Sequence, residues 1–163
     1  MRRKTNKPAA TWRMADALAA KLLSFENKVK LRRFAEGEQL YRQGELNTCF
    51  YFVKSGLVQV SMFRFDGTEV VLENMGPKAL CGEGAAFDGQ PRFSTAVAVE
   101  ATEALEFDTK RFEALVNGDP ELALTMLRLT SLKQRILALR LVHLVSNDPE
   151  SPSGIFLNRE NRL

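Results

Sequence analysis

The residues of this sequence that are best suited to chemistry lie between residues 82 and 95. Arg92 carries a planar guanidinium, which can pair with a phosphate or a carboxylate through two parallel hydrogen bonds. Glu83 can accept hydrogen bonds from hydroxyl groups. These two side chains predict a site for a small anionic ligand. In the alternative interpretation, Arg92 and Glu83 pair with each other or with a neighbour and only hold an empty loop in shape.

Other kinds of chemistry find little support in the residue types. The two cysteines, Cys49 and Cys81, are far apart in the sequence and form no C-x-x-C pair, so neither a disulfide scaffold nor a zinc site is predicted. The single histidine, His143, leaves few options for acid–base catalysis or metal binding, and we expect neither an enzyme nor a metal site. Redox sensing through a cysteine stays open, although neither has a basic sequence neighbour that would lower the thiol pKa.

Length, composition and charge describe a globular chain with a basic start. With 163 residues, 45% of them hydrophobic, the chain can bury a core. Because it has neither a membrane-length apolar run nor the apolar stretch of a secretion signal, we expect a cytoplasmic protein with no membrane partner. Residues 1–33 contain ten Lys or Arg and two acidic residues, so of the net charge of +3 they carry +8 and the remainder −5. This basic region is either a solvated tail or a surface for nucleic acid or an acidic partner.

Hydrophobic periodicity predicts one helix followed by several strands. Between Ala9 and Phe25, apolar residues recur at helical spacing. After this helix the period changes to two, as in half-buried strands. Asp66-Gly67 supplies the positive φ angles of a tight turn and predicts a hairpin from Val58 to Leu72. The expected strands are 39–42, 49–53, 57–62, 95–99 and 104–107.

Two helices are predicted after the strands. The first begins at Asp108-Thr109 and stops at Asn117-Gly118, where glycine can take the left-handed conformation of a helix cap. The second begins at Asp119-Pro120 and runs to about Val145, since aspartate caps the free amides and proline suits the first helical position.

Leucine stripes on the long helix predict a homodimer. Apolar residues recur there at coiled-coil spacing and define a dimer seam of Leu122, Leu129, Leu132, Ile136, Leu139 and His143. A second stripe, which faces elsewhere, consists of Leu124, Leu127, Leu137, Leu141 and Leu144. One stripe can lie on the barrel while the other meets a second copy. The alternative is a helix packed wholly on its own domain.

The stretch from Leu80 to Ala96 resembles the phosphate-binding cassette of cyclic-nucleotide-binding domains. In that family a Gly-Glu pair opens a short helix, and an arginine follows that is usually preceded by proline and followed by small residues and threonine. The residues that fit this pattern are Gly82, Glu83, Pro91, Arg92 and Thr95. Gly44, the strand and turn from Tyr51 to Gly56, and the Asp66-Gly67 hairpin agree with the family as well. By layout, the chain is similar to bacterial transcription regulators of the Crp/Fnr type over about residues 30 to 145.

The resemblance implies a mainly β fold with flanking helices: a double-stranded β-helix, or jelly-roll-like barrel, plus a long C-terminal dimerisation helix. The implied parts are a basic N-terminal segment and helix (1–29), the sensor barrel (30–117), the dimerisation helix (118–146), and a linker that leads into a DNA-binding domain (147–163). A cyclic nucleotide or another small anion would bind at the helix amides and Arg92. The implied effector-binding residues are Gly82, Glu83, Gly84, Arg92, Phe93, Ser94 and Thr95.

Departures from the family pattern bear on the effector. Phe93 stands where ligand-binding members usually have a small residue, so its ring is expected to crowd the pocket. Lys78 replaces a glycine in the loop before the cassette. Leu137 and Ala138, near the positions that would face a purine, have no group that reads a base edge. We therefore expect an effector other than ordinary cyclic AMP.

The implied function is that of the effector-sensing and dimerisation part of a DNA-binding regulator. Crp/Fnr regulators carry a helix-turn-helix after the dimer helix. Here the sequence stops after residues 155–163, in which Asn158 looks like the cap of that domain's first helix. DNA binding would then belong to a C-terminal domain absent from this sequence. The rival is a stand-alone regulatory module that docks on a partner protein and binds no DNA.

Overall fold

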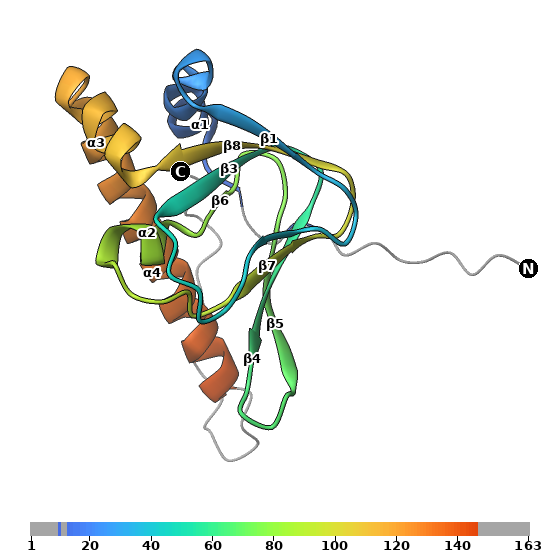
Figure 1. The fold of residues 1–163 in the computed structure, drawn as a ribbon. Coiled ribbons are helices and arrows are strands. Elements are labelled where there is room, and N and C mark those ends of the chain that lie inside the picture. The colour runs from blue at the N-terminus through green and yellow to red at the C-terminus, as the bar shows by residue number, and fades with distance from the viewer. Residues whose placement is uncertain (1–9, 11–12, 147–163) are drawn as a thin grey trace, which may run out of the picture. The chain divides into compact units, whose positions relative to one another are not determined.

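The computed structural model describes residue 10 and residues 13–146 (Figure 1). The chain divides into two compact units, Met1–Thr125 and Met126–Leu163. Every strand among the described residues belongs to the first unit. Within the described part of the chain, no helix has the length and apolar character needed to cross a bilayer.

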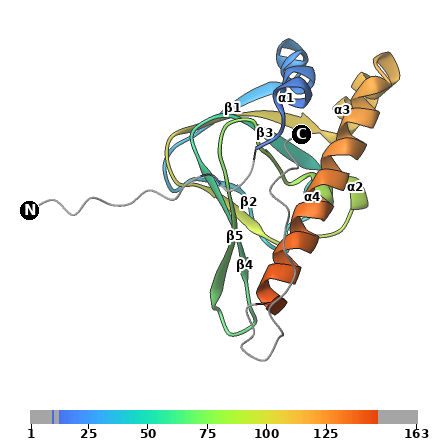
Figure 2. The same ribbon diagram turned by 180° about the vertical axis from the view of Figure 1, so that it is seen from behind.

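Two antiparallel four-stranded sheets build the first unit (Figures 1 and 2). Tyr41 of one sheet stacks on Tyr51 of the other, with ring centroids 6.4 Å apart, so these two side chains fill the interior between the sheets. The expected barrel of the cyclic-nucleotide-binding type is confirmed. The first sheet has the order β1 (Lys30–Phe34), β8 (Thr102–Asp108), β3 (Cys49–Ser55) and β6 (Leu80–Cys81). The second has the order β2 (Gln39–Tyr41), β7 (Thr95–Ala98), β4 (Val58–Phe63) and β5 (Glu69–Met75).

The strand predictions need correction at β1, at the start of β8, and at the two-residue strand β6, which was not predicted. The sequence of β1, Lys-Leu-Arg-Arg-Phe, gave no strand signal because Phe34 alone of its five residues is buried. Strand β8 begins at Thr102 rather than Ala104, since Thr102 pairs with Phe34 across the sheet. Of the four residues between the predicted strands 95–99 and 104–107, the last two therefore belong to β8.

The two helices after the barrel begin and end close to the predicted residues, whereas the N-terminal helix does not. Helix α1 (Asp16–Leu23) is shorter than the predicted 9–25, of which residues 9, 11 and 12 lie outside the described residues; the 3-10 helix η1 (Glu26–Lys28) follows it. Asp108 caps α3 (Thr109–Gly118), as expected, by accepting a hydrogen bond from the amide of Lys110 at 3.0 Å. Helix α4 (Glu121–Ser146) follows the predicted Asp-Pro start. The remaining helix, α2, runs from Glu83 to Asp88.

An aromatic cluster fixes α2 and α3 against the first sheet. The rings of Phe50 on β3 and Phe107 on β8 stack with centroids 5.0 Å apart. Phe112 of α3 and Phe87 of α2 each lie 5.3 Å from Phe50, and both side chains of the stacked pair are completely buried. Burial of this apolar surface stabilises the fold and holds α2 and α3 against the first sheet.

The turn between β3 and β4 supplies a test of the barrel's packing. Gly56 has a φ of +88°, and an added Cβ would lie 2.4 Å from Thr102 Oγ1 and 2.5 Å from the Ala101 carbonyl oxygen. Gly67 has a similar φ of +83°, but no atom lies within 4 Å of an added Cβ. We expect Gly56→Ala to lower the free energy of unfolding by about 3 kcal/mol, and Gly67→Ala by about 1 kcal/mol, because only the first adds a steric clash to the left-handed strain. Equal losses in urea unfolding would contradict this packing.

Candidate functional site

Gly82 connects the last residue of β6 to the first turn of α2. Its φ of +84° lies in the left-handed region, which favours glycine. An added Cβ would also lie 2.9 Å from Arg92 Nη1 and 3.0 Å from the ring of Tyr41. The glycine is therefore required both by the backbone conformation and by the close approach of the arginine.

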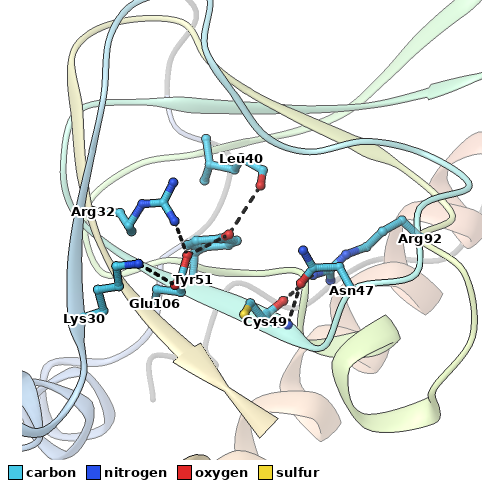
Figure 3. Close-up of polar contacts among 8 residues, drawn as sticks. All are labelled: Lys30, Arg32, Leu40, Asn47, Cys49, Tyr51, Arg92 and Glu106. Carbon is cyan, nitrogen blue, oxygen red and sulfur yellow. Dashed lines mark hydrogen bonds and ion pairs between the residues drawn. The ribbon is translucent and has the colours of Figure 1, made fainter.

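Arg92 is buried inside the barrel, with 2% of its surface exposed. Its Nη1 donates to the carbonyl oxygen of Gly82. Its Nη2 donates to the Cys49 carbonyl oxygen and, at 3.2 Å, to Asn47 Oδ1 (Figure 3). The guanidinium carbon lies 4.4 Å from the centroid of the Tyr41 ring, which provides a cation–π contact. The sequence-based alternative, in which Arg92 pairs with neighbours and holds the loop in shape, describes this geometry.

One N–H group of the Arg92 guanidinium makes no hydrogen bond to the described residues. Its Nε is buried and has no hydrogen-bond partner among the described residues. An unpaired buried donor is costly and uncommon, so such an atom marks a place where an acceptor can be gained. Arg92 thus has a structural role in this conformation and keeps one buried N–H that makes no hydrogen bond to the described residues.

The other predicted effector-binding residues surround Arg92 to different degrees. Glu83 is buried in the first turn of α2, and Ser94 is buried as well. Thr95, also buried, accepts a hydrogen bond from the backbone amide of Gln43 at 3.0 Å through its hydroxyl. Phe93 is 59% exposed, so its ring does not fill the barrel. Instead, a ring carbon of Phe93 would lie 3.5 Å from a Cβ added to Gly84, so the ring covers the first turn of α2 from outside.

Two residues of the site were missed by the sequence analysis. The ring of Tyr41 lies against Arg92. Burial is the main cause that raises the pKa of the Tyr41 phenol, and the nearby Cys81 is the second, while a hydrogen bond with Ser94 opposes the rise. Its phenol therefore stays protonated and can serve as a donor. The strand prediction for 39–42 contained Tyr41, but nothing in the sequence said which face it occupies. Asn47 lies in the loop after β2, where no periodicity singles it out.

A second polar group lies on the first sheet. Glu106 accepts hydrogen bonds from Arg32 Nη1 at 2.8 Å and from the Tyr51 hydroxyl at 3.2 Å, and Lys30 Nζ lies 4.0 Å from its other oxygen (Figure 3). Burial, and then the Glu106 carboxylate, raise the pKa of Tyr51. In this cluster the Glu106 carboxylate is paired with two cations, and the contacts link β1, β8 and β3, so we assign the cluster to the stability of the sheet.

An open hollow of about 980 Å³ lies beside the β4–β5 hairpin. It is lined by residues of β2 and its following turn, including Arg42 and Gln43, and by residues 62–66 of the hairpin. Of the predicted effector-binding residues, Thr95 alone lines it. The hollow therefore meets the predicted site at Thr95 and is not lined by Arg92 or Glu83.

The long helix requires a correction to the predicted dimer seam. Leu122, the first seam residue, is completely buried, and it lies in the first unit, where Thr125 is buried too. Leu122 therefore belongs to the core of its own chain. Leu129, Leu132, Ile136, Leu139 and His143 lie on the part of α4 in the second unit, and their place in a dimer stays a prediction. Residues 147–163, including the predicted Asn158 cap, lie outside the described residues.

A barrel with a buried arginine beside a Gly-Glu helix start defines an effector-binding type of domain, and comparison with known proteins gives the family. The model of the "Cyclic nucleotide-binding domain" family matches residues 31–119, more than half of the chain. The chain belongs to this family and is related to CRP-like regulators.

Individual relatives are regulatory proteins. A "CRP-like cAMP-activated global transcriptional regulator" of Mycobacterium tuberculosis is 29% identical over 115 residues, which cover 71% of this chain and 51% of that protein. A "cAMP-dependent protein kinase regulatory subunit" of Dictyostelium discoideum is 32% identical over 85 residues, covering 50% of this chain and 26% of that protein. The crystal structure of Thermus thermophilus catabolite activator protein matches with a TM-score of 0.68 and 30% identity, over 81% of this chain and 61% of that one. The chain thus spans about half or less of the length of these curated relatives.

The cysteines show no sign of an activated thiol. Cys81 is buried. For Cys49, burial is the main cause that raises the thiol pKa, and the carboxylates of Glu106 and Asp108 raise it further. A raised pKa lowers the thiolate fraction at neutral pH and hence the reactivity of the thiol. Within the described residues, no group of three or more His, Cys, Asp or Glu could hold a metal ion.

The raised thiol pKa predicts slow alkylation. In a Cys81→Ala variant, which leaves Cys49 as the one cysteine, we expect the rate of reaction with iodoacetamide to rise with pH around a midpoint above that of free cysteine, about 8.5. The same variant unfolded in urea serves as the control. A midpoint at or below that of the control would mean that Cys49 is activated, and would restore redox sensing as a function.

Proposed function

We propose that this chain is the effector-sensing and dimerisation part of a cytoplasmic DNA-binding transcription regulator of the Crp/Fnr type, and that it binds a small anion without catalysing a reaction. The observation that carries the proposal is the buried Arg92 beside Gly82 in a barrel of the cyclic-nucleotide-binding family. In this mechanism the effector shifts the dimer helix and so the spacing of two DNA-reading modules.

Phe93 argues for an effector other than ordinary cyclic AMP. Its ring lies over Gly84, at the turn of α2 whose amides would face an anion. Arg92 also offers few free donors, because Gly82, Asn47 and Cys49 already accept from it. The Mycobacterium relative is named for activation by cyclic AMP, so this nucleotide is the reference probe.

A thermal-shift screen of cyclic nucleotides and small organic anions tests the effector proposal. For an anion at 100 times its Kd we expect the melting temperature to rise by roughly 5–10 °C, since about 2.7 kcal/mol of binding free energy is added to the folded state. Cyclic AMP should leave the melting temperature of the unaltered chain unchanged. Phe93→Ala should gain a response to cyclic AMP, because the ring no longer covers α2.

Phe65→Ala is the matched control, since Phe65 is a fully exposed ring on the hairpin turn. Sodium chloride at equal ionic strength controls for salt effects. Tight binding of cyclic AMP that does not change in Phe93→Ala would refute the exclusion of this nucleotide. No response to any anion would refute effector sensing itself.

For the dimer we propose the second leucine stripe of α4. Residues seven apart share one side of a helix, so Leu129, Ile136 and His143 lie on the same side of α4 as the buried Leu122. Leu127, Leu137 and Leu141 lie on a different side and are 63%, 58% and 63% exposed. Exposed leucines at this spacing favour burial against a second copy of the helix.

Substitutions at two neighbouring residues distinguish the predicted seam from the second stripe as the dimer interface. Leu137→Glu should convert the dimer to a monomer in sedimentation velocity at tens of micromolar, because a carboxylate would be buried in the interface. Ile136→Glu, one residue away on another side of the helix, should leave the dimer intact. The reverse result would restore the seam that contains Ile136, and a monomeric unaltered chain would refute the dimer.

The second candidate is a stand-alone regulatory module that binds a partner protein and no DNA. The match to a protein kinase regulatory subunit favours it, since the same type of domain occurs there in a subunit of a kinase. A gel shift of the full-length gene product with its own upstream DNA separates the two candidates.

A further inference from the structure

Residues 44–49, which are the end of the β2–β3 connection and Cys49, the first residue of β3, form a segment that we call the 44–49 loop, and its backbone is fastened to Arg92. The amide of Gly44 donates to the carbonyl oxygen of Arg92 at 2.7 Å, and the amide of Arg92 donates to the carbonyl oxygen of Glu45 at 2.9 Å. The side chain of Arg92 then reaches Asn47 and Cys49 at the far end of the same loop. Four hydrogen bonds thus tie one arginine to one loop.

Asn47 is the side-chain acceptor within this set. Its Oδ1 accepts from Arg92 Nη2 at 3.2 Å and also from the backbone amide of Cys49 at 2.7 Å, which closes an Asx turn (Figure 3). The other acceptors for the guanidinium, at Gly82 and Cys49, are backbone carbonyls at strand ends. Asn47 is therefore the partner of Arg92 that can leave without moving a strand.

A guanidinium has five N–H donors and binds an anion best through two neighbouring ones. In Arg92, both Nη2 donors and one Nη1 donor are used, while Nε is buried without a partner among the described residues. The pair formed by Nε and Nη2 is therefore half occupied. An anion gains the two-point contact when it replaces the amide oxygen of Asn47.

We propose that Asn47 competes with the anionic effector for Arg92, so that the 44–49 loop holds the empty cassette closed and is released when an anion binds. This inference rests on the proposed function, because it concerns the regulation of the same site. Asn47 acts here as a positioning residue. It sets the affinity of the site through Arg92 and reports occupancy through the loop that its turn organises.

Two substitutions at Asn47 should change affinity in opposite directions. Asn47→Ser keeps a hydroxyl that can accept from the Cys49 amide but is too short to reach Arg92, so the guanidinium is released. Asn47→Asp keeps the turn and adds a charge-assisted bond to Arg92, so the clamp tightens. We expect inorganic phosphate, titrated by calorimetry at constant ionic strength, to bind about tenfold more tightly to Asn47→Ser and about tenfold more weakly to Asn47→Asp than to the unaltered chain.

Leu46→Ser is the matched control, because Leu46 belongs to the same loop and is 74% exposed. It should bind phosphate within twofold of the unaltered chain. As a measurement that needs no ligand, solvent exchange of the Arg92 Nε and Nη protons, observed by NMR, should be faster in Asn47→Ser and slower in Asn47→Asp. Simple loss of folding would weaken binding in both variants.

The outcomes separate this inference from the function on which it rests. If the unaltered chain binds phosphate or cyclic AMP and Asn47→Ser binds no more tightly, the competition is refuted and effector sensing stands. If Asn47→Ser alone binds, the competition is supported, and effector sensing by the unaltered chain is refuted. If neither binds, both proposals fail.

Discussion

Burying the guanidinium of Arg92 costs free energy unless its donors are paired, and the site is organised around this requirement. Gly82 must lack a side chain because Arg92 Nη1 lies 2.9 Å from the position of a Cβ. Tyr41 offers its ring face to the cation, and the 44–49 loop curls so that Asn47 and Cys49 present oxygen atoms to it. One buried charge thus constrains the positions of three segments: the turn into α2, strand β2 and the 44–49 loop.

This arrangement connects the two interpretations of the cassette. An arginine held by carbonyl and amide oxygens keeps an empty site in shape, as a structural role requires. The same oxygens are weaker partners than an anion would be, since a bond between two charged groups is stronger than a bond to a neutral amide. A site can therefore be complete without its ligand and still respond to one, provided that one acceptor is able to leave.

The aromatic cluster and the charged groups stabilise the barrel without taking part in this exchange. Phe50 and Phe107 fix α2 and α3 on one face of the first sheet. Glu106 joins the strands β1, β8 and β3 of the same sheet. In the proposed mechanism this frame holds α2 against the first sheet while the 44–49 loop is released from Arg92. Rigid elements that position a mobile loop are the usual basis of ligand-controlled change.

Local backbone preference and residue spacing were enough to predict the Asp66-Gly67 hairpin, the cap at Asp108 and the two helices after the barrel, whereas strands β1 and β6 were not predicted. The cassette from Gly82 to Thr95 was identified by its resemblance to the family. The tertiary structure decided which faces are buried. It placed Leu122 in the core rather than in a seam, Phe93 at the surface, and Tyr41 and Asn47 against Arg92. The reason is physical: these contacts join segments far apart in the chain, and neither periodicity nor residue type shows which side of a helix or loop a distant partner will cover.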